Sequence, residues 1–197
     1  MDERLVAWAR AVKARQAKIS PGRALPVLWL FTDEVRLPDP SDAVARLPRG
    51  LCGVVLRHDG VADRAALARR LARLCRARRN LLVVAGDWRL AVALRAGVHL
   101  RGGRRQPMSR CLVNTASAHG VAELVAARRA GVALVFLSPA FATLSHPGAA
   151  GFGPVRWSGQ ARRVVVAVAA LGGVAGGNVG RLAARSCVAV GAIGALA

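Results

Sequence analysis

The sequence is poor in aromatic and acidic residues. Aromatic residues make up 4 % of the 197 positions, tyrosine is absent, and 10 acidic residues face 30 basic ones. The formal charge of +20 comes almost entirely from arginine, because the only lysines are Lys13 and Lys18. Proteins that bind single-stranded nucleic acid stack its bases on aromatic side chains set among basic ones. No arginine run here is interleaved with aromatics, so the composition argues against that class of protein.

A basic chain can still bind nucleic acid in other ways, or bind phosphorylated ligands. The alternative is that arginine is simply the solvated residue of the predicted helices. Seven arginines crowd one such segment, 61–79, which favours this second interpretation. We therefore do not expect nucleic acid as a partner.

Cysteine motifs and membrane-spanning runs are also missing. Four widely spaced cysteines form no C-x-x-C pair and no cluster with histidine: Cys52, Cys75, Cys111 and Cys187. Three of them stand in apolar runs, so we expect buried free thiols and a reducing, cytoplasmic location. The uncharged run 164–180 contains five glycines and is a poor membrane span. The charged, amphipathic start of the chain does not resemble a signal peptide.

Short apolar runs alternate along the chain with segments of helical periodicity. A leading helix is predicted over 3–17, followed by strands and helices in turn. The predicted strands are 25–32, 51–57, 80–86, 97–100, 110–117, 132–138, 164–171 and 187–193. The helices between them are 61–79, 88–96, 118–131, 156–163 and 176–186, and a polar loop with three prolines follows the first strand.

Most predicted strands are apolar throughout, which is typical of parallel strands that helices cover on the outside. Strands that alternate with helices form right-handed βαβ units, and eight such units predict an α/β fold, a small (β/α)8 TIM barrel. An open doubly wound sheet is the alternative. Because the composition shows no break, we expect one domain, 1–197, in which residues 1–24 form an N-terminal helical extension.

Four residues near the end of the chain are candidates for phosphate binding. Gly172 and Gly173 follow the seventh predicted strand, and Ile193 and Gly194 end the eighth. In barrels of this class the loops after these two strands commonly bind phosphate, and glycine lets backbone N–H groups approach it. Tight packing can also require glycine at such positions. Neither G-x-G-x-x-G nor the Walker motif is present.

Polar residues also follow the middle strands. The loop 138–154 carries Thr143, Ser145 and His146, whose hydroxyls and imidazole can bind a second anion or can merely satisfy turns. His119 stands where a strand meets a helix, and it can move protons or make a local hydrogen bond.

Carboxylates follow three of the early strands. Asp33, Asp59 and Asp87 could hold Mg²⁺ if the fold brings them to one point, because this ion prefers oxygen ligands. His99 lies within a predicted strand, and we expect it to be structural.

In the order in which they occur, several segments resemble the thiamine phosphate synthase / thiazole tautomerase family. The matching segments cover the chain from about Leu25 to Leu196 and are LFTD (30–33), GVVLRHD (53–59), the stretch 81–103, SAHGVAEL (117–124), SPAFATLSHPG (138–148), ALGGV (170–174) and VGAIGAL (190–196). The resemblance implies a (β/α)8 barrel. It also implies the condensation of hydroxymethylpyrimidine pyrophosphate with hydroxyethylthiazole phosphate, which releases pyrophosphate and uses Mg²⁺.

The resemblance gives each matching residue an expected role. Those expected to bind the thiazole phosphate are Gly172, Gly173, Ile193 and Gly194. Those expected to bind pyrophosphate are Thr143, Ser145 and His146. Arg57 is the basic residue retained on the second strand and His119 stands at the family's S-x-H position, so both are candidate catalytic residues.

Two acidic metal positions of the family fall on Gly86 and Arg104 in this sequence. The family thus implies Mg²⁺, whereas the residues present argue against it. Arg57, Arg101 and Arg104 could neutralise pyrophosphate directly instead.

Two other functions fit the same resemblance. One is a metal-independent thiazole phosphate tautomerase that uses His119 to move protons, and the other is a non-catalytic barrel that binds a phosphorylated ligand. In each case the expected partners are small phosphorylated molecules. The leading helix either caps the barrel or forms a homodimer.

Overall fold

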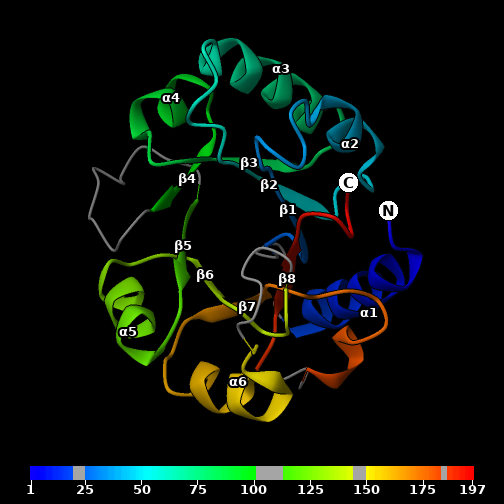
Figure 1. The fold of residues 1–197 in the computed structure, drawn as a ribbon, viewed down its shortest axis with the longest axis vertical. Coiled ribbons are helices and arrows are strands. Elements are labelled where there is room, and N and C mark those ends of the chain that lie inside the picture. Colours follow the sequence, from blue (N-terminus) through cyan, green and yellow to red (C-terminus); the bar gives the residue numbers. More distant parts are fainter. Residues whose placement is uncertain (20–24, 101–112, 144–149, 183–185) are drawn as a thin grey trace.

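A computed structural model describes residues 1–19, 25–100, 113–143, 150–182 and 186–197. Eight parallel strands close into a barrel in the order β1 to β8, each paired with its neighbours in sequence and β8 with β1 (Figure 1). The strands are β1 (Leu28–Phe31), β2 (Cys52–Leu56), β3 (Leu81–Ala85), β4 (Gly97–Leu100), β5 (Asn114–Ala118), β6 (Leu134–Leu137), β7 (Ala167–Leu171) and β8 (Ala189–Ala192). The predicted (β/α)8 barrel is therefore confirmed, and the open sheet was the wrong alternative.

Strand side chains alternate between two buried layers, which explains the continuous apolar runs in the sequence. On β1, Trp29 and Phe31 point into the barrel, whereas Leu28 and Leu30 pack under the helices. Phe136 from β6 meets both inner rings edge to face, at 5.4 and 4.7 Å between ring centroids. These rings pack inside the barrel, whose interior is therefore a core and not a pore.

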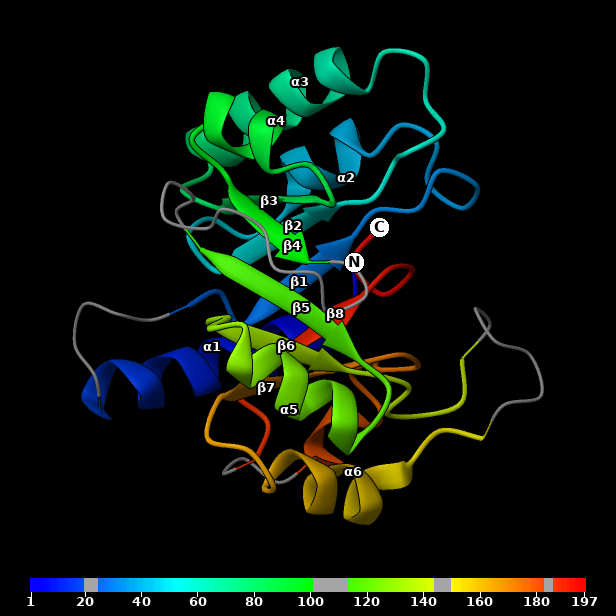
Figure 2. The ribbon, with the colours of Figure 1, turned by 90° about the vertical axis from the view of Figure 1, so that its left-hand side faces the viewer.

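The helices outside the barrel mostly match the sequence prediction. They are α1 (Glu3–Ile19), α2 (Ser41–Arg46), α3 (Arg64–Ala77), α4 (Trp88–Ala93), α5 (Val121–Arg129) and α6 (Gly153–Ala161). Figure 2 shows α3 and α4 on one side of the barrel and α5 and α6 on the opposite side. The periodic segments were thus found, with ends displaced by a few residues.

Two elements differ from the prediction. The segment 176–186 was expected to be a helix, but its described residues form only a 3-10 turn, Val179–Arg181, after which Leu182 is extended. The short helix α2 was missed inside the proline-containing loop. Pro40 precedes its first residue, where a helix tolerates proline because that position needs no N–H donor.

Helix α1 lies against the outer face of the barrel beside β8 and β1 (Figure 1). Its side chains Leu5, Ala9 and Val12 are buried in the outer core layer. Near its end, Gln16 Nε2 donates to the Val188 carbonyl at 2.8 Å, at the amino end of β8. Its first turn reaches the opposite end, where Asp2 N donates to the Ala195 carbonyl at 2.8 Å. The helix therefore runs antiparallel to the strands, from the barrel mouth to its base.

Candidate active site at the barrel mouth

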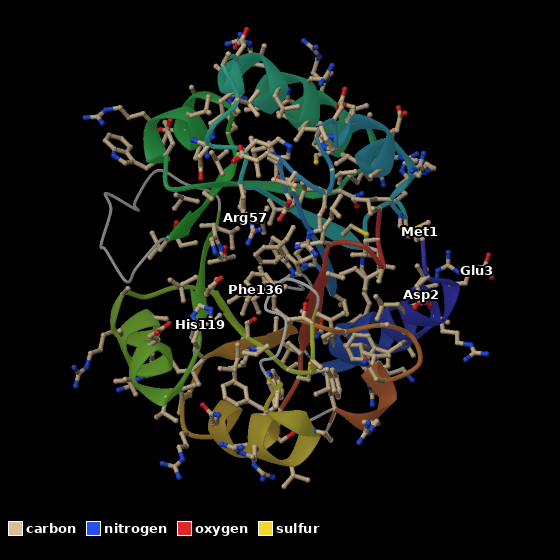
Figure 3. The ribbon with its side chains drawn as sticks, viewed as in Figure 1. Met1, Asp2, Glu3, Arg57, His119 and Phe136 are labelled. Atoms are coloured by element: carbon tan, nitrogen blue, oxygen red, sulfur yellow. The ribbon has the colours of Figure 1, made fainter. Side chains whose placement is uncertain are left out.

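A cavity of ≈ 1190 Å³ opens at the carboxyl ends of the strands. The predicted catalytic, phosphate-binding and pyrophosphate-binding residues within the described ranges all line it: Arg57, His119, Thr143, Gly172, Gly173, Ile193 and Gly194. Figure 3 shows Arg57, which follows β2, and His119, which follows β5, on different sides of Phe136 in the barrel centre. Ser145, His146, Arg101 and Arg104 lie outside the described residues. The fold thus brings together residues from the ends of β2, β5, β6, β7 and β8 that are far apart in the sequence.

Packing accounts for the first two glycines. Gly172 and Gly173 have φ of +87° and +65°, and a Cβ on Gly173 would lie 2.1 Å from the Ala142 carbonyl oxygen. The cause is the start of the loop after β6, where Phe141 N donates to the Gly172 carbonyl at 3.0 Å. This pairing also places Thr143 beside the β7 loop. The packing explanation of the glycine pair is therefore correct, and it does not conflict with ligand binding.

Gly194 is different, because neither a close neighbouring atom nor its backbone conformation requires glycine there. A Cβ at Gly194 would meet no atom within 4 Å, and its backbone is not in the left-handed region. Together with Ile193 it lines the cavity. Within the described part of the chain, the backbone N–H groups of Gly172, Gly173, Ile193 and Gly194 donate no hydrogen bond. We call these four residues the amide cradle. It offers donors and open space to an anion without any charged side chain.

The opposite side of the mouth carries charged side chains in ion pairs. Asp33 Oδ2 lies 3.3 Å from both Arg36 Nη2 and Arg57 Nη2. The backbone N–H of Arg36 donates to Asp33, and this bond, followed by the Arg36 guanidinium, lowers the pKa of the Asp33 carboxyl. Arg57 is also held by the Thr32 carbonyl, which accepts from Nε at 3.2 Å. Two arginines therefore share one carboxylate at the cavity wall.

A second arginine–carboxylate group lies between β2 and β3. Arg64 Nη2 is 3.1 Å from Asp59 Oδ1, and Arg64 Nη1 is 3.9 Å from Asp87 Oδ2. The same guanidinium donates to the Ala85 carbonyl at 2.6 Å. Asp87 also caps α4, since its Oδ1 accepts from Leu90 N at 2.9 Å. An arginine thus stands among the oxygen atoms that a cation would need.

The three aspartates do not form one metal site. Asp59 and Asp87 share Arg64, whereas Asp33 is held by Arg36 and Arg57. In the described ranges, no group of three or more acidic, histidine or cysteine side chains could hold a metal ion. Because each carboxylate already faces a guanidinium, the donor set of the described residues does not fit Mg²⁺.

His119 lies in the cavity at the end of β5. Its side chain is 59 % exposed, and Glu123 Oε2 accepts from the His119 backbone N–H at 3.0 Å and lies 3.2 Å from Nδ1. The local hydrogen bond considered from the sequence is therefore present. Within the described residues Nε2 has no such partner, so this nitrogen remains available for a proton of a ligand.

His99 lies in the cavity, which the sequence prediction did not anticipate. It was expected to be structural, and its ring is indeed buried, with Nδ1 2.8 Å from Thr115 Oγ1. However, its Nε2 lies 3.0 Å from Ser117 Oγ, and both His99 and Ser117 line the cavity. The T-x-S spacing on β5 was the available signal, because residues i and i+2 of a strand face the same side. His99 and Ser117 therefore join the candidate site.

The cysteines agree with the composition-based prediction where they are described. Cys52, Cys75 and Cys187 are buried free thiols, and burial raises the pKa of each to about 12. They are therefore inert packing residues. Cys111 lies outside the described residues.

The closed barrel and the position of its cavity define a (β/α)8 barrel protein with its cavity, the candidate site, at the carboxyl ends of the strands. The family model for thiamine monophosphate synthase matches residues 40–196, and the chain belongs to this family. The resemblance seen in the sequence motifs is thereby confirmed. The family is one of transferases that act in thiamine biosynthesis.

Solved structures show the same fold. Thiamine phosphate pyrophosphorylase from Pyrococcus furiosus matches with a TM-score of 0.69 and 20 % identity, over 84 % of each chain. Thiamine phosphate pyrophosphorylase from Bacteroides thetaiotaomicron has a TM-score of 0.55 and 18 % identity, over 86 % of this chain and 83 % of its own. FabK from Thermotoga maritima, at 14 % identity, has a TM-score of 0.66 over 92 % of this chain and 61 % of its own.

The search of curated proteins gave no match. Among the described helices, none has the length and apolar character needed to span a membrane.

Proposed function

We propose that the protein is a thiamine phosphate synthase-type transferase. It would join the ring nitrogen of hydroxyethylthiazole phosphate to the methylene carbon of hydroxymethylpyrimidine pyrophosphate. One C–N bond forms, one C–O bond breaks, and pyrophosphate leaves with the bonding electron pair. Family membership supports the general reaction, and the two chemically distinct sides of the cavity support two phosphorylated substrates.

The observation that carries this proposal is a single large cavity with anion-binding groups on two sides. Ligand cavities usually span about 300–1,000 Å³, and this one measures ≈ 1190 Å³. That volume exceeds what one small heterocyclic phosphate requires. The amide cradle would hold the thiazole phosphate, and Thr143 would contact the pyrophosphate together with Ser145 and His146.

The charge that develops on the departing pyrophosphate has to be stabilised by the protein. Arg57 reaches the cavity wall from β2, and Arg36 lies beside it on the shared carboxylate of Asp33. Guanidinium groups bind phosphate oxygens in pairs and keep their charge at any physiological pH. Because the described donors do not fit Mg²⁺, we assign this stabilisation to the arginines. The expected location of this reaction is the cytoplasm.

The test is the reaction itself. Purified protein is incubated with both substrates, with added Mg²⁺ in one arm and with EDTA in the other. Thiamine phosphate and pyrophosphate are quantified by chromatography and ³¹P NMR. We expect both products in equal amounts in both arms. If neither arm gives thiamine phosphate, the synthase proposal is wrong, and binding of thiamine phosphate without turnover would then identify a non-catalytic phosphate-binding barrel.

A thiazole phosphate tautomerase is the second candidate, and the pairing of His119 with Glu123 favours it. A carboxylate next to Nδ1 holds the imidazole in one orientation and leaves Nε2 to take a proton from one ring atom and return it to another. The thiazole carboxylate phosphate tautomer is the substrate to test. Acceleration that disappears in His119→Ala would support this reaction, and equal rates in both proteins would exclude it.

A further inference from the structure

The first turn of α1 touches both loops of the amide cradle. Asp2 Oδ2 accepts a hydrogen bond from Gly176 N at 2.6 Å, in the loop that follows Gly172 and Gly173. The backbone N–H of Asp2 donates to the carbonyl of Ala195, next to Gly194, at 2.8 Å. One residue therefore connects the β7 loop with the β8 loop (Figure 3 labels Asp2 at the start of α1).

The same carboxylate also begins the helix. Asp2 Oδ1 accepts from Arg4 N at 3.0 Å and from Leu5 N at 3.2 Å, as an N-terminal capping residue does. A negative charge at this end of a helix is favourable on its own. One carboxylate oxygen of Asp2 thus accepts hydrogen bonds from α1, and the other accepts one from the β7 loop. Displacing α1 would therefore remove a hydrogen bond from that loop.

Gly176 shows how closely the helix and the loop approach. A Cβ on Gly176 would lie 2.4 Å from Asp2 Oδ1 and 2.5 Å from Arg4 Cβ. The neighbouring Gly177 would meet no atom within 4 Å. Neither glycine has a φ in the left-handed region, so only the contact with α1 distinguishes them. This difference supplies a matched pair of variants.

From these contacts we propose that Asp2 is a positioning residue for the amide cradle, so that docking of α1 and binding of a phosphate ester favour each other. The proposal rests on the proposed function insofar as the cradle is the phosphate site. Asn178 stabilises the same loop by hydrogen bonds within it, because its Nδ2 donates to the Gly173 carbonyl and its Oδ1 accepts from Ala175 N. Asp2 adds the connection to β8 that Asn178 cannot make.

The remainder of α1 is anchored independently of Asp2. Its apolar side chains are buried along the barrel, Gln16 is bound to Val188, and Lys13 Nζ donates to the Gly50 carbonyl at the base. Removing the Asp2 side chain should therefore loosen the β7 loop without releasing the helix, while the backbone N–H of Asp2 still donates to the Ala195 carbonyl. This makes a change in ligand affinity separable from a loss of folding.

The experiment compares Asp2→Ala and Gly176→Ala with the controls Glu3→Gln and Gly177→Ala. Binding of thiamine phosphate is measured by calorimetry, well below the melting temperature of every variant. We expect the first pair to bind about tenfold more weakly, the effect of one lost hydrogen bond to a charged group, and the controls to bind as the wild type does. Hydrogen exchange of residues 3–19 is measured with and without ligand.

Coupling between two events is reciprocal, so thiamine phosphate must slow exchange in α1 of the wild type. The slowing should be smaller in Asp2→Ala, which a purely structural role for Asp2 would not predict. Wild-type affinity in both Asp2→Ala and Gly176→Ala, or unchanged exchange in wild-type α1 on binding, overturns the inference. Failure of the wild type to bind thiamine phosphate overturns the phosphate-cradle assignment together with the inference.

Discussion

The two sides of the barrel mouth are built from different chemical groups. Around β7 and β8 the cavity is lined by glycine, alanine and aliphatic residues, so the polar groups there belong to the backbone. Around β1, β2 and β3 the side chains are charged, and each aspartate faces an arginine. A site made from backbone amides survives most substitutions, provided that its glycines remain. A site made from side chains can change its chemistry by single replacements.

The family resemblance is strong on the β7–β8 side of the mouth and weak on the β1–β3 side. The glycine motifs after β7 and β8 are present, whereas two of the family's acidic metal positions are Gly86 and Arg104. The ion pairs show that the remaining aspartates are used within the protein. We therefore expect the two sides to respond differently to substitution.

The largest effect should come from Arg57→Ala on the charged side. Removing this guanidinium should lower kcat/KM of the condensation about 100-fold, the usual cost of one group that stabilises a developing charge. Steady-state kinetics measures it, with Arg89→Ala as a control, because Arg89 stacks on Trp88 away from the cavity. Equal losses in both variants would mean that net charge, and not the position of Arg57, matters.

In the amide cradle, Gly173→Ala and Gly194→Ala should separate an effect on protein stability from an effect on ligand affinity. At Gly173 a methyl group meets the Ala142 carbonyl and φ is positive, so the free energy of unfolding should fall by at least about 2 kcal/mol. At Gly194 the methyl enters open space, so stability should change by less than about 0.5 kcal/mol. Affinity for thiamine phosphate should nevertheless decrease. Urea denaturation and calorimetry measure the two quantities, and an unchanged affinity in Gly194→Ala would contradict the cradle.

Arg64→Ala should expose a latent cation site on the charged side. Without the guanidinium, Asp59 and Asp87 lack the partner they share, and a divalent ion can bind between them. At a Mg²⁺ concentration ten times its Kd, binding would add about 1.4 kcal/mol to stability. Thermal unfolding with and without Mg²⁺ should show this in the variant and not in the wild type. Arg70→Ala, which releases only Asp39, should show no response, and a response there would contradict the assignment.

The smallest effect concerns the acid stability of the link between α1 and the cradle. The hydrogen bond from Gly176 N lowers the pKa of the Asp2 carboxyl. A lowered folded-state pKa means that its stabilising contribution is complete above about pH 3.9, the ordinary aspartate value. The contribution is lost as the pH falls through the folded-state pKa. The melting temperature of Asp2→Asn should therefore fall less steeply below pH 4 than that of the wild type. Parallel curves would contradict this role.

The sequence allowed prediction of what depends on local pattern. Continuous apolar runs identified the barrel strands, and the spacing of Leu5, Ala9 and Val12 identified α1. The 3-10 turn at 179–181 was mistaken for a helix, because the side chain of Asn178 bonds locally in a way that composition does not reveal. Helix α2 was missed because proline was taken as a loop signal.

Predicting the site was harder where partners come from different strands. The position of the glycine pair and of Gly194 at the barrel mouth could be predicted from their order after the last two strands. In contrast, the pairing of Asp33 with Arg57 joins neighbouring strands 24 residues apart. The sharing of Arg64 by Asp59 and Asp87 also depends on the angle at which α3 packs. Neither follows from spacing along the chain.

The contact between Asp2 and Ala195 has a consequence for chain connectivity. Around the barrel, β8 is followed in space by α1, because residues 193–197 form a turn and α1 then runs back to the base. A circular permutant that joins residue 197 to residue 1 by a short linker, and opens the chain between α1 and β1, would keep every strand pairing. In such a protein α1 would follow β8, as α2, α3, α4, α5 and α6 follow their own strands.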